Sequence, residues 1–450
     1  MKPFLLLLLI SLSGQLYGQS LYVDEAGSCN GLTPCFTSIQ DAVNFALPDT
    51  DVRVFPGSYS ESVDLSLMGS TATRGPVTTG NIAFVGVNSA NEPIMHMATV
   101  TAPSGPAFYH SGSFFVGDLL FSGLIVLSSD DDGIDLDLVS GDITARNVIA
   151  DGNGADGIDV EVATGNHTIL IETTQSNGND SSGLNLDGPD GTTIKVYGAV
   201  ANDNATEGLF VESTALGDQL NVEILNTVTN NNGQAVTDAA GLAVVTDGSI
   251  LIAGSQSDDN AGPGIVVVIS SDTSIRDTQT SGNGIGSFFD GILLQSGGTT
   301  DIRRAVSNNN EAGGLWVASG PGEVHASVTV ACSQFMSNDH GVHVSGGIPN
   351  PATLAVNNSA LAANTTYGLF IGSDQTVDAS SSWWGDASGP THVSNPGGMG
   401  DVVADGVNVL GGSTGIASFV PFLTSAPTID QYAGDTFLVG NFESDPCASF

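Results

Sequence analysis

Residues 130–137 read DDDGIDLD, in which Ile134 and Leu136 alternate with aspartates after Gly133. The same pattern recurs ten times, always as a glycine with apolar residues at the first and third positions after it. The ten glycines are Gly133, Gly157, Gly183, Gly208, Gly241, Gly264, Gly291, Gly314, Gly341 and Gly368. Alternation of this kind predicts a β-strand with one buried face. Its recurrence roughly every 26 residues predicts a solenoid that adds one such strand per coil.

The segments between these strands indicate which solenoid it is. Each repeat continues with a second alternating run, such as DITARNVIA, and no helical pattern fits between the strands. Two or three short strands per coil are typical of a parallel β-solenoid. An asparagine stands four residues before the glycine in six repeats and near that position in three more, so we expect a hydrogen-bonded asparagine ladder at one corner. These asparagines are Asn153, Asn179, Asn204, Asn260, Asn310 and Asn364, with Asn338, Asn232 and Asn283 as the less regular ones.

The start of the chain predicts export. Lys2 precedes the apolar run FLLLLLISLSGQLYGQS, which is too short to span a bilayer and ends in small residues. This pattern indicates a signal peptide, 1–18 or 1–20, and a secreted or cell-surface protein. Four cysteines fit an oxidising compartment; we expect Cys29 to pair with Cys35, while Cys332 and Cys447 are left to pair or stay free.

The charge balance limits the partners. Eight basic residues stand against 48 acidic ones, for a formal net charge of −40. Such a surface repels nucleic acid and anionic lipid, so we expect no nucleic-acid partner. No later segment is apolar and long enough for membrane insertion. Oligomeric state is not predicted.

Both ends of the repeat region resemble a known superfamily. The stretch CNGLTPCFTSIQDAVNFALPDTDVRVFPGSYSESVDL, residues 29–65, and the segment beginning WWGDASGPTHVSNPGGMGD, residues 383–423, are similar to the first and closing segments of secreted bacterial pectin-lyase-like proteins. The resemblance implies an all-β, single-domain, right-handed parallel β-helix with a short N-terminal capping helix and an irregular C-terminal cap. Its expected parts are an N-terminal cap and first strand (21–65), the β-helix (66–382, with clear repeats from 130), a closing segment (383–423) and a tail (424–450).

Stacking places acidic residues of successive coils ~4.8 Å apart. We expect one outward column of Asp137, Glu161, Asp187 and Glu212 beside another that begins with Asp135 and Asp159. One interpretation is a Ca²⁺ site made by Asp135, Asp137, Asp159 and Glu161. A second is a catalytic carboxylate pair of a glycoside hydrolase, with Asp135 and Asp159 as candidates. The third is a solvated acidic surface without a ligand. The N-T-D and R-I-K signatures of polygalacturonase-like members are absent.

Basic and aromatic residues supply the other candidates. Arg276 and Arg303 are expected in one column on adjacent coils, where they would grip a carboxylate or act as the base that pectate-lyase-like members use together with Ca²⁺; the alternative is an ion network with Asp277 and Asp301. Trp316 and His343 share an outward column and would stack a sugar ring. The alternative there is that the cap near Trp383 and Trp384 covers this apolar strip.

Two functions follow. The first is a secreted β-helix protein that binds extracellular polysaccharide and, as an enzyme, would cleave it as a lyase or glycoside hydrolase. The second is a non-catalytic, adhesin-like solenoid of the cell surface or matrix.

Overall fold

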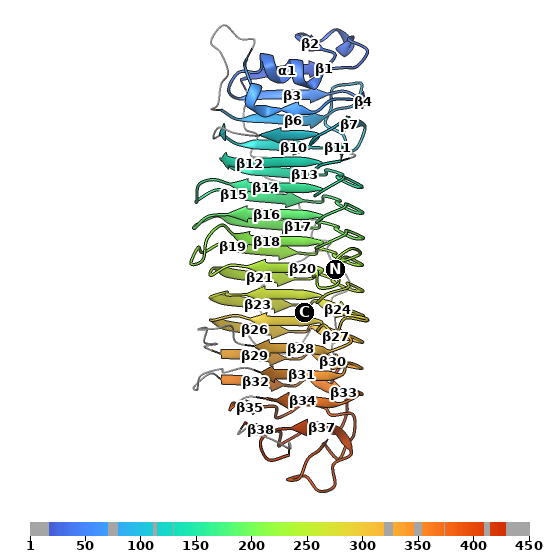
Figure 1. The fold of residues 1–450 in the computed structure, drawn as a ribbon, viewed down its shortest axis with the longest axis vertical. Coiled ribbons are helices and arrows are strands. Elements are labelled where there is room, and N and C mark those ends of the chain that lie inside the picture. The colour runs from blue at the N-terminus through green and yellow to red at the C-terminus, as the bar shows by residue number, and fades with distance from the viewer. Residues whose placement is uncertain are drawn as a thin grey trace, which may run out of the picture.

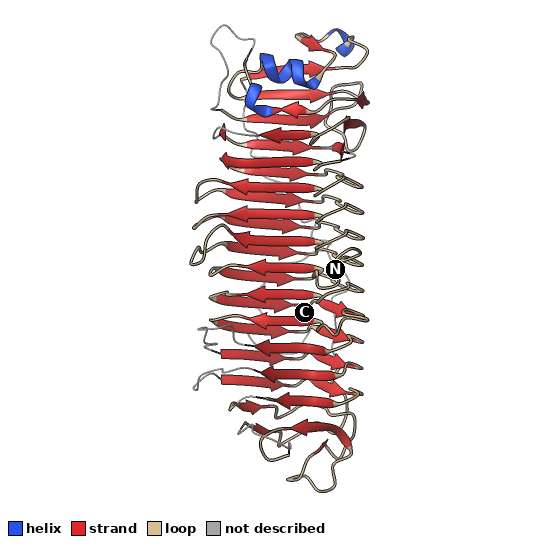
Figure 2. Ribbon diagram, viewed as in Figure 1, coloured by secondary structure: helices blue, strands red, loops and turns tan. Residues whose placement is uncertain are grey.

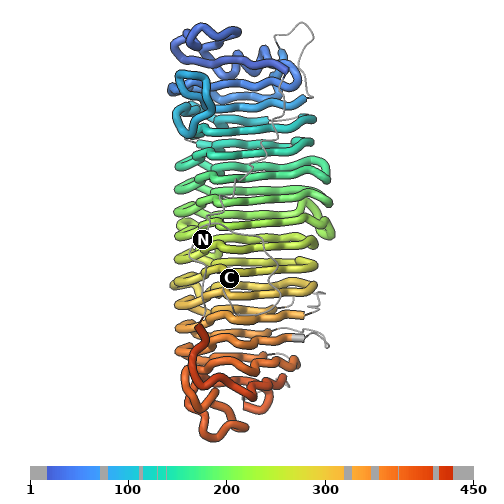
Figure 3. The backbone as a smooth tube through the Cα atoms, turned by 180° about the vertical axis from the view of Figure 1, so that it is seen from behind, coloured from blue at the N-terminus to red at the C-terminus, as the bar shows by residue number. Residues whose placement is uncertain are grey.

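The chain forms one long stack of β-strands (Figures 1 and 2). The structure is a computed structural model that describes residues 18–70, 80–110, 115–128, 130–318, 327–345, 353–372, 374–408 and 415–428. The coils follow one another along the rod in chain order, as the tube seen from behind shows (Figure 3). The strands of each coil pair in parallel with the equivalent strands of the coils before and after it. The predicted parallel β-helix is therefore confirmed.

Two long sheets form the sides of the β-helix. Sheet 1 has the strand order β2 (Cys35–Phe36), β1 (Gln19–Val23), β3 (Thr50–Val54), β6 (Ile82–Gly86), β10 (Leu119–Ser122), β13 (Ile143–Arg146), β15 (Thr168–Glu172), β17 (Thr193–Tyr197), β19 (Asn221–Leu225), β21 (Ser249–Ala253), β23 (Asp272–Arg276), β26 (Thr299–Arg303), β29 (Ser327–Ala331), β32 (Thr353–Asn357), β35 (Thr376–Asp378), β38 (Ile416–Ser418). Sheet 2 has the order β36 (Pro390–Thr391), β37 (Gly400–Ala404), β34 (Tyr367–Ile371), β31 (His340–Ser345), β28 (Gly313–Ala318), β25 (Ile292–Gln295), β22 (Ile265–Val268), β20 (Leu242–Val245), β18 (Leu209–Ser213), β16 (Leu184–Gly188), β14 (Ile158–Val162), β12 (Ile134–Ser140), β8 (Phe108–His110), β5 (Val63–Asp64), and β9 (Phe115–Val116) also pairs with β12.

Two shorter sheets lie at a corner of the coil. One contains β11 (Leu124–Ser128), β7 (Ala98–Ala102) and β4 (Gly57–Tyr59), and the other contains β24 (Gln279–Ser281), β27 (Val306–Asn308), β30 (Gln334–Met336) and β33 (Ala360–Ala362). Single parallel bridges from Ile125 to Gln279 join the two along the rod. The coils therefore turn from sheet 1 through this corner into sheet 2.

The ten glycine-led segments form ten successive strands of sheet 2, from β12 to β34. Their two apolar positions point inward: Ile158 and Val160 are each about 1% exposed. The glycine itself is required by close packing at the corner. A Cβ on Gly157 would lie 1.7 Å from Ser176 Oγ and 2.8 Å from Asn179 Nδ2, closer than any real contact. The repeated glycine thus makes room for the next coil.

The asparagine ladder predicted at the corner is present. From Asn153 to Asn338, the backbone N–H of each ladder asparagine donates to the side-chain Oδ1 of the next, over 2.8–3.1 Å. The ladder includes Asn232 and Asn283, although insertions follow both. At its C-terminal end, Asp401 accepts from the backbone N–H and the Nδ2 of Asn364, at 2.8 and 3.0 Å. These bonds satisfy polar groups that the solenoid buries at every turn.

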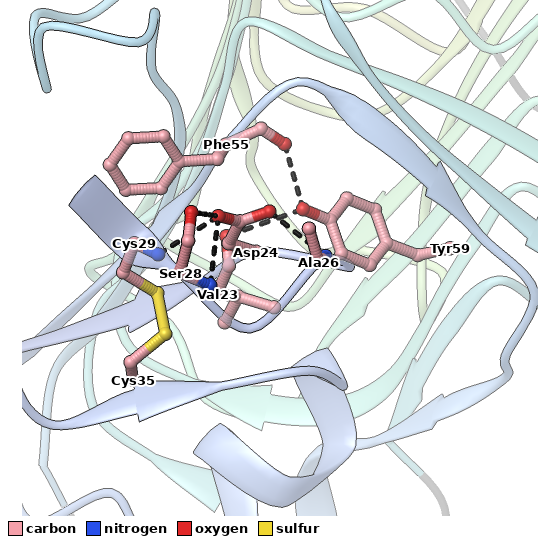
Figure 4. Close-up of a disulfide and its surroundings, with 8 residues drawn as sticks. All are labelled: Val23, Asp24, Ala26, Ser28, Cys29, Cys35, Phe55 and Tyr59. Carbon is pink, nitrogen blue, oxygen red and sulfur yellow. Dashed lines mark hydrogen bonds between the residues drawn. A yellow bond between two sulfur atoms is a disulfide. The ribbon is translucent and has the colours of Figure 1, made fainter. Parts of the chain in front are cut away.

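The N-terminal end is covered by the predicted helix, α1 (Ile39–Phe45), whose N-cap Ser38 accepts a hydrogen bond from the N–H of Asp41. The 3-10 turns η1 (Cys29–Gly31) and η2 (Leu65–Leu67) flank it. Cys29 and Cys35 form the expected disulfide (Figure 4). Close to it, the Tyr59 hydroxyl donates to the backbone carbonyls of Val23 and Phe55. Cys332 is also disulfide-bonded, and Cys447 lies outside the described residues.

The C-terminal end of the core is covered by buried aromatic side chains of the closing segment. Trp384 is fully buried and its ring lies 6.5 Å from that of Phe419. Trp383 forms a parallel backbone bridge with Ala360 and so extends the short corner sheet that contains β33. Trp384 therefore fills the open end of the core rather than lying over the outward strip of Trp316 and His343. Within the described parts of the chain, no helix has the length and apolar character needed to cross a bilayer.

Candidate functional site

An acidic cluster lies on the N-terminal half of sheet 2. Asp135 pairs in register with Asp159, as predicted from the repeat, and Asp159 with Asn185. Asp132, at the corner before Gly133, completes the cluster: carboxyl oxygens of Asp132, Asp135 and Asp159 all lie within 4.8 Å of one another. The sequence placed Asp132 next to the repeated glycine, but the turn that brings it over the strand could not be read from that position.

The second predicted column is only partly formed. Glu161, Asp187 and Glu212 are in register on β14, β16 and β18. Asp137 is not, because β12 has an irregularity after Leu136 and regains its register only where Val139 meets Val162. Asp137 is exposed, and its backbone carbonyl faces His110 Nδ1 at 3.0 Å. The structure therefore brings Asp135 and Asp159 together and leaves Asp137 and Glu161 outside the cluster.

Burial dominates the electrostatics of the cluster. Loss of water raises the pKa of Asp132 to about 7, of Asp135 to about 6 and of Asp159 to about 8, and repulsion from neighbouring aspartates adds to each. Burial and the charges of Glu212 and Glu161 raise the pKa of Asp187 to about 7. Asn185 Nδ2 donates to Asp159 at 3.0 Å but brings no positive charge. The carboxyl groups of the cluster therefore repel one another, and no cationic side chain among the described residues forms an ion pair with them.

The donor set suits a hard divalent cation. Ca²⁺ takes carboxylate oxygens at ~2.3–2.6 Å, so ligands on opposite sides of the ion lie up to ~5 Å apart. The 4.8 Å limit found for Asp132, Asp135 and Asp159 falls within that span. The same closeness does not match the ~6.5–9.5 Å between the carboxyl groups of an inverting glycoside hydrolase, but it is near the ~5–5.5 Å of a retaining one.

A groove on the opposite long sheet was not foreseen from the sequence. It has a volume of about 540 Å³, is open to solvent and crosses five neighbouring strands, β17, β19, β21, β23 and β26. Four coil steps of ~4.8 Å give it a length of ~19 Å. Its lining combines hydroxyl, amide and carboxyl groups with an apolar floor, and includes Thr193, Asn221, Glu223, Ser249, Leu251, Asp272, Ser274, Thr299 and Asp301.

The predicted arginine pair borders this groove. Arg276 and Arg303 are in register on β23 and β26, as expected. Both bind the groove residue Asp301, over 3.3 Å from Arg276 Nη2 and 2.9 Å from Arg303 Nε. Asp277 instead binds Arg304. Two guanidinium groups share one carboxylate, so these three side chains together carry one net positive charge, beside the acidic groove residues Glu223 and Asp272.

An aromatic strip occupies the C-terminal half of sheet 2. Trp316 and His343 are in register, and their rings stack with centroids 5.5 Å apart and planes 8° from parallel. The ring of Phe370 meets His343 edge-on at 4.9 Å. Burial lowers the pKa of His343 to about 4, so its imidazole is neutral at ordinary pH. The structure thus joins the two predicted residues, on the same sheet as the acidic cluster but several coils farther along it.

No protein-family model and no curated protein matches the chain. Among solved structures, it is similar to the A-modules of two Azotobacter vinelandii mannuronan C-5 epimerases, AlgE4 and AlgE6. The AlgE4 module has 13% identity and a TM-score of 0.40, with 75% of this chain and 95% of that chain covered. The AlgE6 module has 14% identity and a TM-score of 0.36, with 84% and 93% covered.

An alginate lyase from Paenibacillus sp. str. FPU-7 is also similar, with 14% identity, a TM-score of 0.26, and coverage of 79% of this chain and 98% of that chain. Similarity this low says nothing about what the present chain acts on. The strand topology defines the chain as a parallel β-helix protein.

Proposed function

We propose that the chain is a secreted protein that binds an extracellular polysaccharide along the groove of sheet 1. The observation that carries the proposal is the groove itself, ~19 Å long, with polar groups repeating along its length and the apolar Leu251 in the same outward column as Glu223 and Ser274. Binding sites for small molecules and chains of sugars combine apolar contact with a few placed polar groups. The positive edge made by Arg276 and Arg303 would attract the carboxylates of uronic sugars, which the rest of the surface repels.

The arginines give the proposal its sharpest test. The double variant Arg276→Ala/Arg303→Ala should bind uronic polysaccharides ~10–100-fold more weakly, because a charged hydrogen bond contributes ~1.5–3 kcal/mol. Arg146→Ala is the matched control: Arg146 occupies the same outward column of sheet 1, on β13, but lies outside the groove and pairs with Glu172. Calorimetric titration with neutral and uronic oligosaccharides would measure both. Equal losses for the two variants would contradict binding in the groove.

Chemistry at the groove is tested by product release from the same polysaccharides by the mature protein, with Ca²⁺ and with chelator. Unsaturated products would establish a lyase, and new reducing ends without unsaturation a hydrolase. Binding without any product would favour the non-catalytic surface or matrix solenoid. N-terminal sequencing of exported protein would test secretion; processing after Gly18 would leave β1 (Gln19–Val23) whole.

We propose further that Asp132, Asp135 and Asp159 bind Ca²⁺. The three converging carboxyl groups with raised pKa values support this, since a cation would remove their mutual repulsion and offset the cost of ionising them away from water. Calcium titration of the wild type and of Asp159→Asn should show one site that the variant loses. Retention of the site by Asp159→Asn and its loss in Asp137→Asn would instead place calcium at the exposed end of β12.

A further inference from the structure

A third group of reactive side chains lies in the closing segment, away from the groove and the acidic cluster. Ser394 Oγ lies 2.7 Å from His392 Nδ1, and His392 Nε2 lies 3.1 Å from Asp405 Oδ1. Asp405 is fully buried and His392 is 7% exposed, whereas Ser394 is exposed. An accessible hydroxyl is therefore linked through a buried imidazole to a buried carboxylate.

The hydrogen bonds determine the tautomer of His392. The backbone N–H of Ser394 donates to His392 Nδ1 at 3.2 Å, and a backbone N–H cannot accept. Nδ1 must therefore carry the lone pair, so Nε2 carries the proton and donates it to Asp405. The lone pair that accepts from the backbone also faces the Ser394 hydroxyl. This is the protonation pattern in which an imidazole acts as base toward a serine while a carboxylate orients it.

The surroundings hold this arrangement in place. Asp405 accepts hydrogen bonds from the backbone N–H groups of Val407 and Ala417. Burial by itself would raise the pKa of Asp405, but these donors and His392 outweigh it and lower the pKa, so the carboxyl stays ionised. Asn395, next to the serine, donates through Nδ2 to the backbone carbonyls of Ser388 and Pro390, at 2.9 and 2.8 Å. The loop that carries Ser394 is thereby fixed to the strand before it.

We propose that Ser394, His392 and Asp405 form a hydrolytic site for carboxylic esters, with Ser394 as nucleophile. Val393 and Met399 lie on either side of the serine in the same loop and are 58% and 74% exposed. These apolar side chains offer contact to a small acyl group of a substrate that approaches from solvent. The proposal does not depend on polysaccharide binding in the groove.

The reaction uses only water besides the ester. Ser394 Oγ attacks the carbonyl carbon while its proton passes to His392 Nδ1. The carbon–oxygen bond to the alcohol then breaks, and His392 returns the proton to the departing alkoxide. Water, deprotonated by His392, attacks the acyl-serine, and the carboxylic acid leaves as Ser394 regains its proton. The imidazolium formed in each half is stabilised by the ionised Asp405.

The test uses the full mature chain, with p-nitrophenyl acetate as substrate and a fluorophosphonate as covalent probe. Peptide mass spectrometry should find the probe on Ser394, and Ser394→Ala should lose both labelling and ~10²–10⁴-fold of the hydrolysis rate, because the base His392 then has no hydroxyl to deprotonate. His392→Gln should behave alike. Because His392 is buried, its variant counts only if the melting temperature shows it folded, whereas the exposed Ser394→Ala needs no such condition.

Ser58→Ala, which removes an exposed serine on β4, is the control and should keep both labelling and rate. Hydrolysis that persists in Ser394→Ala, or a folded wild type that takes no probe at Ser394, would overturn the proposal. In that event the three residues serve only to fasten the closing loop to β38.

Discussion

Replacing Asp159 by asparagine should stabilise the protein at pH 8 in the presence of chelator. Burial raises the pKa of Asp159 to about 8 in the folded state, against ~3.9 in the unfolded chain. Between these two values the unfolded state ionises while the folded state stays protonated, so the folded state binds more protons and loses stability as the pH rises. The loss is complete above about pH 8, and asparagine, which is uncharged, removes it.

The size of the effect follows from the shift. Four pKa units at ~1.36 kcal/mol each give an upper bound of ~5.5 kcal/mol, and the partial exposure of Asp159 reduces the expected gain to ~2–3 kcal/mol. For a chain of this length, that is a rise in Tm of ~3 °C. The amide introduced by Asp159→Asn can keep its side-chain oxygen toward Asn185 Nδ2, which donates to Asp159 in the wild type.

The assay is thermal unfolding of wild type and variant from pH 5 to 8, with chelator and with Ca²⁺. Saturating Ca²⁺, at ~100 times its Kd, should stabilise the wild type by ~2.7 kcal/mol and leave Asp159→Asn unchanged. Asp137→Asn makes the same charge change at an exposed position of the neighbouring strand and should have little effect. A Tm of Asp159→Asn at or below that of the wild type at pH 8 in chelator would refute the reasoning.

Three further predictions concern the scaffold. Asn204→Ala should lower the free energy of unfolding in urea by ~2–4 kcal/mol, because it removes the acceptor of two buried donors of Asn179. The control Asn221→Ala, at an exposed position, should lower it by less than ~0.5 kcal/mol. Gly157→Ala should lower Tm by more than either, since its Cβ would overlap Ser176 Oγ at 1.7 Å; a neutral effect would mean that the coils separate freely there. Asp290→Asn should be stabilising above pH 7 and neutral at pH 4, because burial raises the pKa of Asp290 to about 7; equal Tm values at both pH values would contradict it.

Much of the fold could be predicted because the repeat fixes two things at once. A glycine followed by apolar residues at the first and third positions gives both the strand and its inward face, as for Ile158 and Val160. The asparagine before it gives the corner, so even Asn232 enters the ladder despite the longer loop that follows. A coil that misplaced either residue would leave buried polar groups without hydrogen-bond partners. The free-energy cost of those unpaired groups favours the observed register between neighbouring coils.

The candidate cluster was predicted less completely because register is a property of pairs of strands. Asp137 has the right spacing from Gly133, but β12 leaves register with β14 after Leu136, and the side chain lies outside the acidic cluster. Nothing in the residues of β12 alone predicts this irregularity, which coincides with the point where the partner of β12 on its other side changes from β8 to β9.

The groove on sheet 1 was missed for a different reason. Its hollow comes from short side chains that happen to be neighbours across coils, such as Asn221, Ser249 and Thr299, which lie in one outward column with Asp272. Outward positions of a solenoid tolerate almost any polar residue, so no local pattern distinguishes a small side chain that forms a groove from one that is merely exposed. The arginine pair could be predicted because basic residues are few in this sequence and the repeat places Arg276 and Arg303 in the same column. The space beside it becomes apparent only when the outward columns of successive coils are compared with one another.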